Sequence, residues 1–314
     1  MIRRTQLASR VAALLAAMSL LAVVPALPAA ALSPTTCQVT DTESKVVKPS
    51  LQAAVDAAKR GHHLTVRGVC HGPTVIKKSI TITGIRPAGA ARPTLDGDAA
   101  GSVISTRTGI AVTIRKLRIT DGSGTACGPV CTDGGAIYNH ATLLLDSVRI
   151  DHNTASNVAF AIYNDAAPIT FSGTTSVDHN SGTFSGIYNL GTLTFRDSAS
   201  FHDNTSTLGS GIDNGGTIIL RGSASFHHNA GASGAAIGNG GTVTLRDNAS
   251  IHDNTASDVG GGIANYGIVM LAGSAAISHN TAATKGGGVY NTGTLDPGAC
   301  GTSIHDNSPD DCAS

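Results

Sequence analysis

The chain has 314 residues, of which 38 are glycine, 4% are aromatic and none is tryptophan. This composition suits thin strands joined by tight turns better than a thick globular core. Its 21 basic residues balance its 21 acidic ones, and loss of an N-terminal leader with three arginines would leave 18 against 21. The balance argues against the basic patch that nucleic-acid binding demands, so we expect no nucleic-acid partner.

Residues 1–31 have the pattern of a secretory signal peptide. Arg3, Arg4 and Arg10 form a basic start, an apolar run follows, and small residues up to Ala31 provide a cleavage site. The Arg3–Arg4 pair also leaves twin-arginine export open. No later segment has the roughly 18 consecutive apolar residues of a membrane span. We therefore expect a secreted, extracellular chain without a membrane span.

The six cysteines are an even number, which suits disulfides in an exported protein. Nearest-neighbour pairing is the simplest of the possible arrangements, and it gives Cys37–Cys70, Cys127–Cys131 and Cys300–Cys312. A zinc site is the competing interpretation, but Cys127 and Cys131 have no second cysteine pair at ligand spacing. We expect three disulfides that fasten the two ends and one loop of the fold.

Residues 32–70 form an N-terminal segment with one short helix. The apolar face of this helix consists of Leu51, Ala54, Val55 and Ala58. Ser50 is the expected N-cap, and Gly61 is expected to end the helix. Such a helix would plug the open end of a stack of strands and protect its edge from aggregation.

A repeat of about 25 residues begins at Gly134 and runs toward the C-terminus, with two asparagines in each unit. The first asparagines are Asn139, Asn164, Asn189, Asn214, Asn239, Asn265 and Asn291. The second ones are Asn153, Asn180, Asn204, Asn229, Asn254, Asn280 and Asn307. A fixed period of this size is the signature of a solenoid. The alternating strands upstream are less regular, and they predict about three looser coils before the regular ones.

Apolar residues recur at four registered positions of the repeat unit. The column two residues before the first asparagine is Ile137, Ile162, Ile187, Ile212, Ile237, Ile263 and Val289. One unit is too small to bury its apolar side, but stacked units put like residues in contact about 4.8 Å apart. We therefore predict an all-β, single-stranded right-handed parallel β-helix over 71–314, with about ten coils of three short strands each.

Two asparagine columns imply two corners in each coil. Asparagine tolerates the left-handed backbone conformation that a sharp corner needs, and stacked amides can hydrogen-bond from coil to coil. A glycine column two residues after the first asparagine is expected at the same corner for the same conformational reason. This column is Gly191, Gly216, Gly241, Gly267 and Gly293.

Two stretches resemble known β-helix proteins. The run Ser-Leu-Gln-Ala-Ala-Val-Asp-Ala-Ala-Lys-Arg-Gly from Ser50, with Ile-Thr-Ile-Thr-Gly ending at Gly84, resembles the opening of the pectate-lyase-like superfamily of right-handed parallel β-helices. The units Gly-Gly-Ala-Ile at 134–137 and Phe-His-Asp-Asn at 201–204 are similar to repeats of chlamydial polymorphic outer-membrane proteins. The resemblance implies the fold. It decides no activity, because that superfamily includes lyases, hydrolases and adhesins.

Pectate-lyase relatives would bring clustered acidic calcium ligands and a catalytic Arg or Lys, and no such cluster can be placed in the sequence. The outward position before the first asparagine carries one carboxylate, Asp213, which is the candidate catalytic residue. Paired carboxylates for glycoside hydrolysis remain open only across different strands. We expect Asp310 and Asp311 to be solvated acids. Calcium is expected only if the protein is a lyase, and otherwise we expect no cofactor.

The same outward position carries Tyr138, Tyr163 and Tyr188 in three successive units. These tyrosines could form a flat aromatic strip that stacks on sugar rings. The alternative is an aromatic ladder that only covers a strand and gains cross-strand packing.

Arg196, Arg221 and Arg246 form a second outward column. Like charges at this spacing repel unless something anionic lies between them. The neighbouring Asp197 and Asp247 could supply that negative charge. The alternative is an acidic polysaccharide that lies along the column.

The two positions before the second asparagine hold eight of the twelve histidines, mixed with aspartates. Stacked His and Asp could bind a divalent metal or change charge as the pH falls through the imidazole range. The metal candidates are His202, His227 and His252. The alternative is that duplication of the repeat copied a solvated histidine into every coil.

One segment, 121–135, departs from the repeat and contains Cys127 and Cys131. It is either a recognition loop or an irregular coil held by a disulfide. Taken together, the sequence favours a monomeric, non-catalytic extracellular or envelope-associated module that binds a polysaccharide or another surface component through repeated weak contacts. The alternatives are a polysaccharide lyase or glycoside hydrolase with its site near Tyr163, Tyr188 and Asp213, and a structural spacer of a surface layer.

Overall fold

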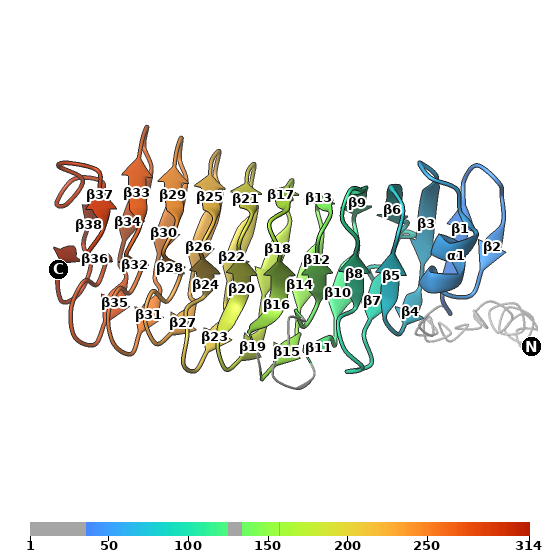
Figure 1. Ribbon diagram of the computed structural model, residues 1–314, viewed down its shortest axis with the longest axis horizontal. Helices are drawn as coiled ribbons and strands as arrows, with labels where there is room; N and C mark the ends of the chain where they lie inside the picture. The colour runs from blue at the N-terminus through green and yellow to red at the C-terminus, as the bar shows by residue number, and fades with distance from the viewer. Residues whose placement is uncertain (1–35, 125–133, 157) are drawn as a thin grey trace, which may run out of the picture. The chain divides into compact units, whose positions relative to one another are not determined.

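The computed structural model describes residues 36–124, 134–156 and 158–314. The predicted leader at 1–31 and the predicted Cys127–Cys131 disulfide lie outside the described residues. The described residues form a parallel β-solenoid of about nine turns, which confirms the predicted all-β architecture (Figure 1). The first ladder of parallel pairs between coils starts at His63 and Thr81.

Each regular coil passes through four sheets, which we call first to fourth in the order in which a coil meets them. The first sheet contains β5 (Thr74–Ile76), β8 (Ile104–Thr106), β12 (Ile137–Asn139), β16 (Ala159–Asn164), β20 (Ser185–Asn189), β24 (Ile212–Asn214), β28 (Ile237–Asn239), β32 (Ile263–Asn265), β36 (Val289–Asn291) and β39 (Cys312–Ala313). The second sheet contains β3 (His63–Arg67), β6 (Ile80–Gly84), β9 (Ala111–Arg115), β13 (Thr142–Asp146), β17 (Pro168–Ser172), β21 (Thr192–Phe195), β25 (Thr217–Leu220), β29 (Thr242–Leu245), β33 (Ile268–Leu271) and β37 (Thr294–Leu295). At its N-terminal edge, this sheet is extended by the antiparallel strands β1 (Gln38–Asp41) and β2 (Val47–Lys48).

The third sheet contains β4 (Val69–His71), β7 (Thr94–Asp96), β10 (Arg118–Thr120), β14 (Arg149–Asp151), β18 (Ser176–Asp178), β22 (Ser200–His202), β26 (Ser225–His227), β30 (Ser250–His252), β34 (Ala276–Ser278) and β38 (Ile304–His305). The fourth contains β11 (Ser123–Gly124), β15 (Thr154–Ala155), β19 (Ser181–Gly182), β23 (Thr205–Ser206), β27 (Ala230–Gly231), β31 (Thr255–Ala256) and β35 (Thr281–Ala282). This fourth sheet was not predicted, because two-residue strands of small residues carry no apolar alternation.

The core consists of the predicted apolar columns. Every residue of the first column has an exposed fraction of 0%, and like residues pair in register, as Ile187 does with Ile212. Burial of one such side chain stabilises the fold by about 2 kcal/mol relative to exposure. A shift of register by one residue would turn the whole set outward, so the columns also specify which residues pair.

Two ladders of asparagine side chains run along the stack. In the first, from Asn139 to Asn291, each Nδ2 donates to the Oδ1 of the next asparagine at 2.7–2.9 Å. In the second, from Asn153 to Asn307, the corresponding distances are 2.8–3.1 Å. The predicted hydrogen bonds between coils are therefore confirmed. Each ladder satisfies buried polar groups that would cost about 1–3 kcal/mol each if they were left unpaired.

The sequence had suggested that the asparagine adopts the left-handed conformation at the corner. The structure shows that another residue does so. No asparagine of the described ranges has a positive φ. Instead, the residue just before the second asparagine has a φ of 53–58°, as at His152, Asp203 and Asp253. The asparagine itself points inward, because its amide serves the ladder. Aspartate and histidine are among the residues that adopt this conformation most readily after glycine.

The predicted glycine column is needed for close approach and not for a left-handed φ. Gly216 and Gly241 are absent from the positive-φ positions. A Cβ atom on either of them would collide with a backbone carbonyl oxygen of the preceding coil. Here only glycine lets the two chains come so close.

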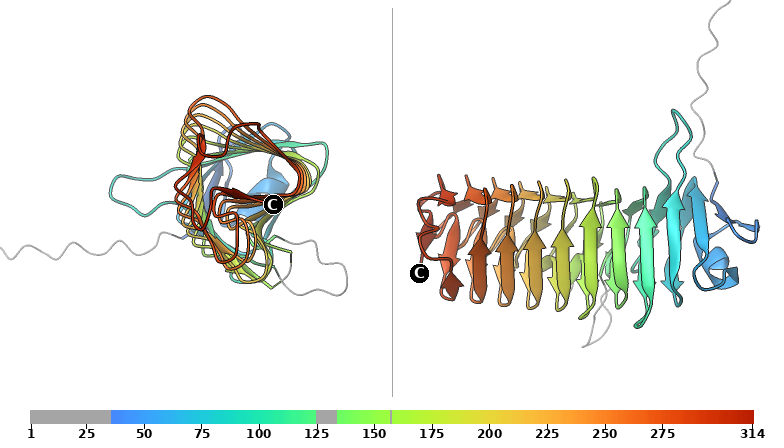
Figure 2. Two further views of the ribbon diagram at one scale, coloured as in Figure 1. Left: turned by 90° about the vertical axis from the view of Figure 1, so that its left-hand side faces the viewer. Right: turned by 90° about the horizontal axis from the view of Figure 1, so that it is seen from above.

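The short helix α1 (Leu51–Ala57) lies at the N-terminal end of the coils (Figures 1 and 2). Its predicted apolar face is buried. Ser50 is the N-cap as predicted, and its Oγ accepts from the amide of Ala53 at 3.2 Å. The helix ends earlier than expected, because Ala58 is already extended and Gly61 lies in the following turn. No helix of the described part has the length and apolar character to span a bilayer.

The C-terminal end is closed by two aspartates that the sequence suggested were merely solvated. Asp311 Oδ1 accepts from the side-chain amide of Asn307 at 3.1 Å, so it ends the second asparagine ladder. Asp310 Oδ1 accepts from the amide of Gly286 at 2.7 Å. Two predicted disulfides, Cys37–Cys70 and Cys300–Cys312, are present near the two ends of the coils.

Candidate functional site

Arg196, Arg221 and Arg246 directly follow β21, β25 and β29 of the second sheet. Because these strands pair in register, the arginines stand in three successive coils. Among the residues that the structure describes, no carboxylate oxygen lies within 4.0 Å of their guanidinium nitrogens. The Nε atom of Arg196 is buried and has no hydrogen-bond partner there. The column is thus a run of positive charge without a paired carboxylate among the described residues.

The neighbouring aspartates form no ion pair within 4.0 Å with the arginines, because their carboxylates bind backbone amides. Asp197 Oδ2 accepts from the amide of Gly173 at 3.0 Å, and Asp247 Oδ2 accepts from the amide of Gly222 at 2.9 Å. Both carboxylates therefore close turns between coils. Both aspartates also have a φ of 60°, which turns the chain sharply after the arginine.

Two shallow hollows join on the outer face of the second sheet beside this column. The first has a volume of about 390 Å³, and its lining includes Thr113, Thr142, Thr170, Arg196 and Arg221. The second, of about 520 Å³, shares Ala111 and Thr142 with the first and reaches Arg60. The two hollows together form an open groove with hydroxyl groups along it and cations toward both ends.

Tyr138, Tyr163 and Tyr188 stand in register on the outer face of the first sheet. Their ring centroids lie 5.4 and 5.2 Å apart, and the last two rings are within 27° of parallel. Partial burial, followed by the charge of Asp165, raises the pKa of Tyr163. Because the rings stack on one another, less ring face remains for a sugar than a flat strip would offer. This geometry favours the packing interpretation over the sugar-binding one.

Asp213 lies in β24 beside Tyr188, and its side chain is exposed. The surrounding chain partly desolvates its carboxyl group and raises the pKa. In the described residues, no group of three or more His, Cys, Asp and Glu with mutually close ligand atoms includes Asp213. Within the described ranges, no acidic cluster that could hold calcium forms around this candidate.

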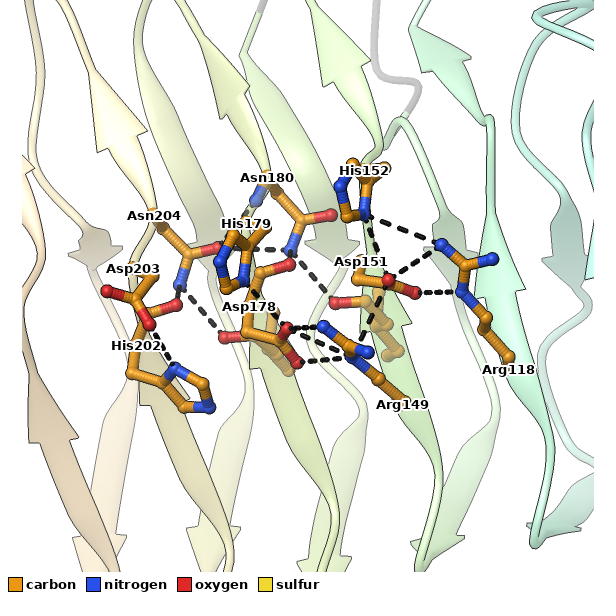
Figure 3. A network of polar contacts seen from close by, with 12 residues as sticks. Arg118, Arg149, Asp151, His152, Asp178, His179, Asn180, His202, Asp203 and Asn204 are labelled. Atoms are coloured by element: carbon orange, nitrogen blue, oxygen red, sulfur yellow. Dashed lines mark hydrogen bonds and ion pairs between the residues drawn. The ribbon is translucent and has the colours of Figure 1, made fainter. Parts of the chain in front are cut away.

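The His and Asp positions form the corner between the third and fourth sheets, shown for β14, β18 and β22 in Figure 3. Here the strand-end carboxylates of Asp151 and Asp178 are 0% and 1% exposed. Arg118 donates through Nε and Nη2 to the two oxygens of Asp151 at 2.7 and 2.8 Å. Arg149 Nη2 lies 2.6 Å from Asp178 Oδ2. In each pair, the arginine reaches forward by one coil.

These contacts keep Asp178 ionised. Burial alone would raise the pKa of this carboxyl group, but hydrogen bonds from Arg149, Ser176 and His179 outweigh it and hold the pKa below its ordinary value. The same contact raises the pKa of Arg149. The sequence analysis did not predict this pairing, although the sequence contains a signal for it. The strands β14 and β18 each end in Asp, and the strand that precedes each of them in the third sheet begins with Arg.

The next three coils replace the buried aspartate by His202, His227 and His252. Successive rings are nearly parallel, at 1° and 9°, with centroids 4.8 and 5.0 Å apart. His202 Nδ1 lies 2.8 Å from Asp203 Oδ2, and His252 Nδ1 lies 2.7 Å from Asp253 Oδ2. The structure thus brings the three predicted metal candidates into one stack.

The middle ring differs from its neighbours in its partner and its acidity. His227 Nδ1 lies 2.8 Å from His228 Nδ1 and faces no carboxylate at that position. Burial, followed by the positive charges that His202, His252 and His228 can carry, lowers the pKa of His227 to about 4. Its imidazole is therefore neutral at neutral pH.

Two further groups, not singled out in the sequence, place ligand-type atoms within 4.8 Å of one another. Their members are Asp41, Glu43 and His62, and His71, Asp96 and Asp98. In each group, the histidine Nδ1 already contacts an aspartate oxygen, at 2.6 Å for His62 and 2.7 Å for His71. They lie in the irregular coils, where no period shows which residues will meet.

The predicted recognition loop at 121–135 lies mostly outside the described residues. No protein-family model, curated protein or solved structure matches this chain. The resemblance to pectate-lyase-like proteins and chlamydial repeats is therefore supported at the level of the β-solenoid fold alone. A function has to be inferred from the groups that the coils bring together.

Proposed function

We propose that this protein is a non-catalytic extracellular module that binds an acidic polysaccharide along the outer face of the second sheet. The observation that carries the proposal is the column of Arg196, Arg221 and Arg246, with which no carboxylate of the described residues forms an ion pair. The like charges of successive coils repel one another, and a bound anion offsets this repulsion, so the column favours anion binding.

The chemistry of the groove fits a charged sugar polymer. Guanidinium groups bind carboxylate or sulfate groups with two parallel hydrogen bonds, and threonine hydroxyls can pair with sugar hydroxyls. Thr113, Thr142 and Thr170 line the same hollow as Arg196 and Arg221. From β9 to β25, four steps of about 4.8 Å span about 19 Å, which is enough for several sugar units. An open groove also suits a polymer, whereas small ligands are usually enclosed.

Secretion is part of this proposal. The disulfides Cys37–Cys70 and Cys300–Cys312 suit an oxidising compartment, because cytosolic thiols are normally kept reduced. The leader pattern at residues 1–31 agrees with this compartment. A polysaccharide of the cell surface or surroundings would then be within reach.

The test is retention of the purified protein on immobilised polyuronate and sulfated polysaccharide, with starch as a neutral control. We expect retention on the acidic polymers, weakened by salt. The double variant R196A/R221A should bind at least about tenfold more weakly, because each charged hydrogen bond is worth about 1.5–3 kcal/mol. The matched control is K59A/K77A, which removes the same charge from exposed positions outside both hollows.

Other outcomes would overturn the proposal and point elsewhere. Equal loss in both double variants would mean unspecific charge attraction. Loss in Y163A but not in R196A/R221A would move the site to the tyrosines. New reducing or unsaturated ends, with or without calcium, would support a lyase or hydrolase and direct attention to Asp213. Binding to no polymer would leave the spacer interpretation.

A further inference from the structure

Charge is distributed unevenly along the coils. Residues 36–120 contain 13 basic and 5 acidic residues, whereas residues 250–314 contain 1 basic and 6 acidic residues. The buried carboxylate of β1 is engaged within the fold, because Asp41 accepts from the amides of Glu43 and Ser44 and also lies 2.6 Å from His62 Nδ1. The N-terminal coils therefore carry a surplus of positive charge, and the last coils carry a surplus of negative charge.

A hollow of about 630 Å³ opens beside the first strands, and its lining includes Val47, Lys48, Arg67 and Pro87. Lys48 of β2 pairs with Val39 of β1, and Arg67 of β3 pairs with Gln38 of β1. The two basic residues thus lie on the strands that flank β1, and two strand spacings of about 10 Å separate their backbones. Among the residues that the structure describes, no carboxylate oxygen lies within 4.0 Å of their side-chain nitrogens.

Apolar side chains are exposed beside these basic residues. Val46 is 43% exposed and Val47 is 50% exposed, and Lys45 and Lys48 flank them in the sequence. A hydrated sugar polymer offers little apolar surface to these valines. The interface of a lipid bilayer takes up apolar side chains among its head groups, and its anionic phosphates attract Lys and Arg. The combination of exposed valines and unpaired cations therefore fits a lipid surface better than a polysaccharide.

We propose that Val46, Val47, Lys48 and Arg67, which we call the N-terminal basic patch, dock the protein on an anionic phospholipid surface. The two cations face lipid phosphates, and the valines enter the boundary between head groups and acyl chains. The same surface repels the acidic coils at 250–314, so the protein binds it through its N-terminal coils. The patch lies at β2 and β3, whereas the hydroxyl groups and arginines of the polysaccharide groove belong to β9 and the strands that follow it.

The test is co-sedimentation of the full secreted chain with vesicles of phosphatidylcholine, either pure or mixed with phosphatidylglycerol. We expect binding only to the vesicles that contain phosphatidylglycerol, and weaker binding as salt is added. The double variant K48A/R67A should bind at least about tenfold more weakly, because each cation near an anionic membrane contributes a factor of about five. V46T/V47T keeps the charge and the β-branched shape. It should bind about threefold more weakly, because hydroxyl groups replace two methyl groups.

The matched control is K59A/K77A, which removes the same charge from exposed positions of the N-terminal coils outside this hollow. We expect it to bind vesicles nearly like the wild type. Equal losses in the two double variants, equal binding to both kinds of vesicle, binding to neither, or unchanged binding in V46T/V47T would each overturn the proposal.

The two proposed binding surfaces can be tested independently. R196A/R221A should bind vesicles like the wild type, and K48A/R67A should be retained on acidic polysaccharides like the wild type. Failure of the N-terminal basic patch and failure of the proposed function can therefore be told apart. If K48A/R67A lost polysaccharide retention but kept vesicle binding, the patch would belong to the polymer site, and the lipid proposal would be overturned.

Discussion

The corner between the third and fourth sheets is built in two ways within one repeat. In the coils of β14 and β18, a buried aspartate pairs with an arginine of the preceding coil. In the coils of β22, β26 and β30, stacked histidines stand in its place, and an aspartate, where present, has moved to the exposed left-handed position. The asparagine ladder is common to both. The ladder therefore holds the shape of the corner, and a buried carboxylate is tolerated only where an arginine reaches it.

Removal of an asparagine from the shared ladder should lower the free energy of unfolding more than any other substitution proposed for this corner. The decrease should be the same in both regions. In N204A, the buried amide of Asn180 loses its acceptor, and two backbone carbonyls lose their donor. Since each unpaired buried group costs about 1–3 kcal/mol, we expect a loss of about 4 kcal/mol in the free energy of unfolding. Urea unfolding followed by circular dichroism measures it. N180A makes the same change in the coil of β18, in the first region, and a much smaller loss there than in N204A would contradict a common role.

Removal of the buried carboxylate should cost less, and only in the first region. D178A leaves Arg149 and His179 without their acceptor. Arg149 is 41% exposed and can turn to water, so we expect the low end of the range for a broken buried pair, about 3 kcal/mol. The same urea titration tests this, and a cost below about 0.5 kcal/mol would show that the pair is dispensable.

The two regions should also lose stability in different pH windows. The pKa of His227 falls from 6.5 to about 4 on folding, so between these values only the unfolded chain takes up this proton. Stability should therefore fall as the pH drops from 6.5 to about 4, with no further loss from this group below that. The contribution of Asp178, whose pKa is depressed, is complete above 3.8 and is lost only as the pH falls further.

Thermal unfolding midpoints at pH 7.5, 5 and 3 separate these effects. H227Q should lose less stability than the wild type between pH 7.5 and 5. The unfolding midpoint of D178N should change by the same amount as that of the wild type between pH 7.5 and 5. Between pH 5 and 3, the two changes should differ. If H227Q and the wild type fall in parallel down to pH 5, His227 is not held neutral by its stack.

The smallest effect is expected from the exposed aspartates of the second region. Asp203 is 43% exposed, and within the described ranges its one ion pair is with His202. D203A should change the free energy of unfolding by less than about 1 kcal/mol, because exposed ion pairs contribute little. D253A is the matched variant in the next coil but one, and a cost in either of them as large as that of D178A would erase the distinction between the two regions.

The parts of the fold that follow from the repeat could be predicted from the sequence. The columns from Ile137 to Val289 and the ladder from Asn139 to Asn291 could be read directly, because a fixed period places like residues in adjacent coils. The candidate site was less predictable. Arg196 and Asp197 are adjacent in sequence, yet the aspartate accepts from the backbone of another coil and forms no ion pair with the arginine. Sequence proximity did not reveal the hydrogen-bond partner of Asp197, because side chains in a solenoid can reach across coils.

The sequence by itself determined the architecture, the register of the coils and the disulfides near both ends, because each of these depends on a local pattern that stacking repeats. Only the tertiary structure decided which corner residue is left-handed, that Asp310 and Asp311 close the last coil, and that His227 faces His228. These features depend on where each side chain lies relative to groups in its own and neighbouring coils. Burial and hydrogen bonding at these positions determine which of the arrangements allowed by the sequence pattern is formed.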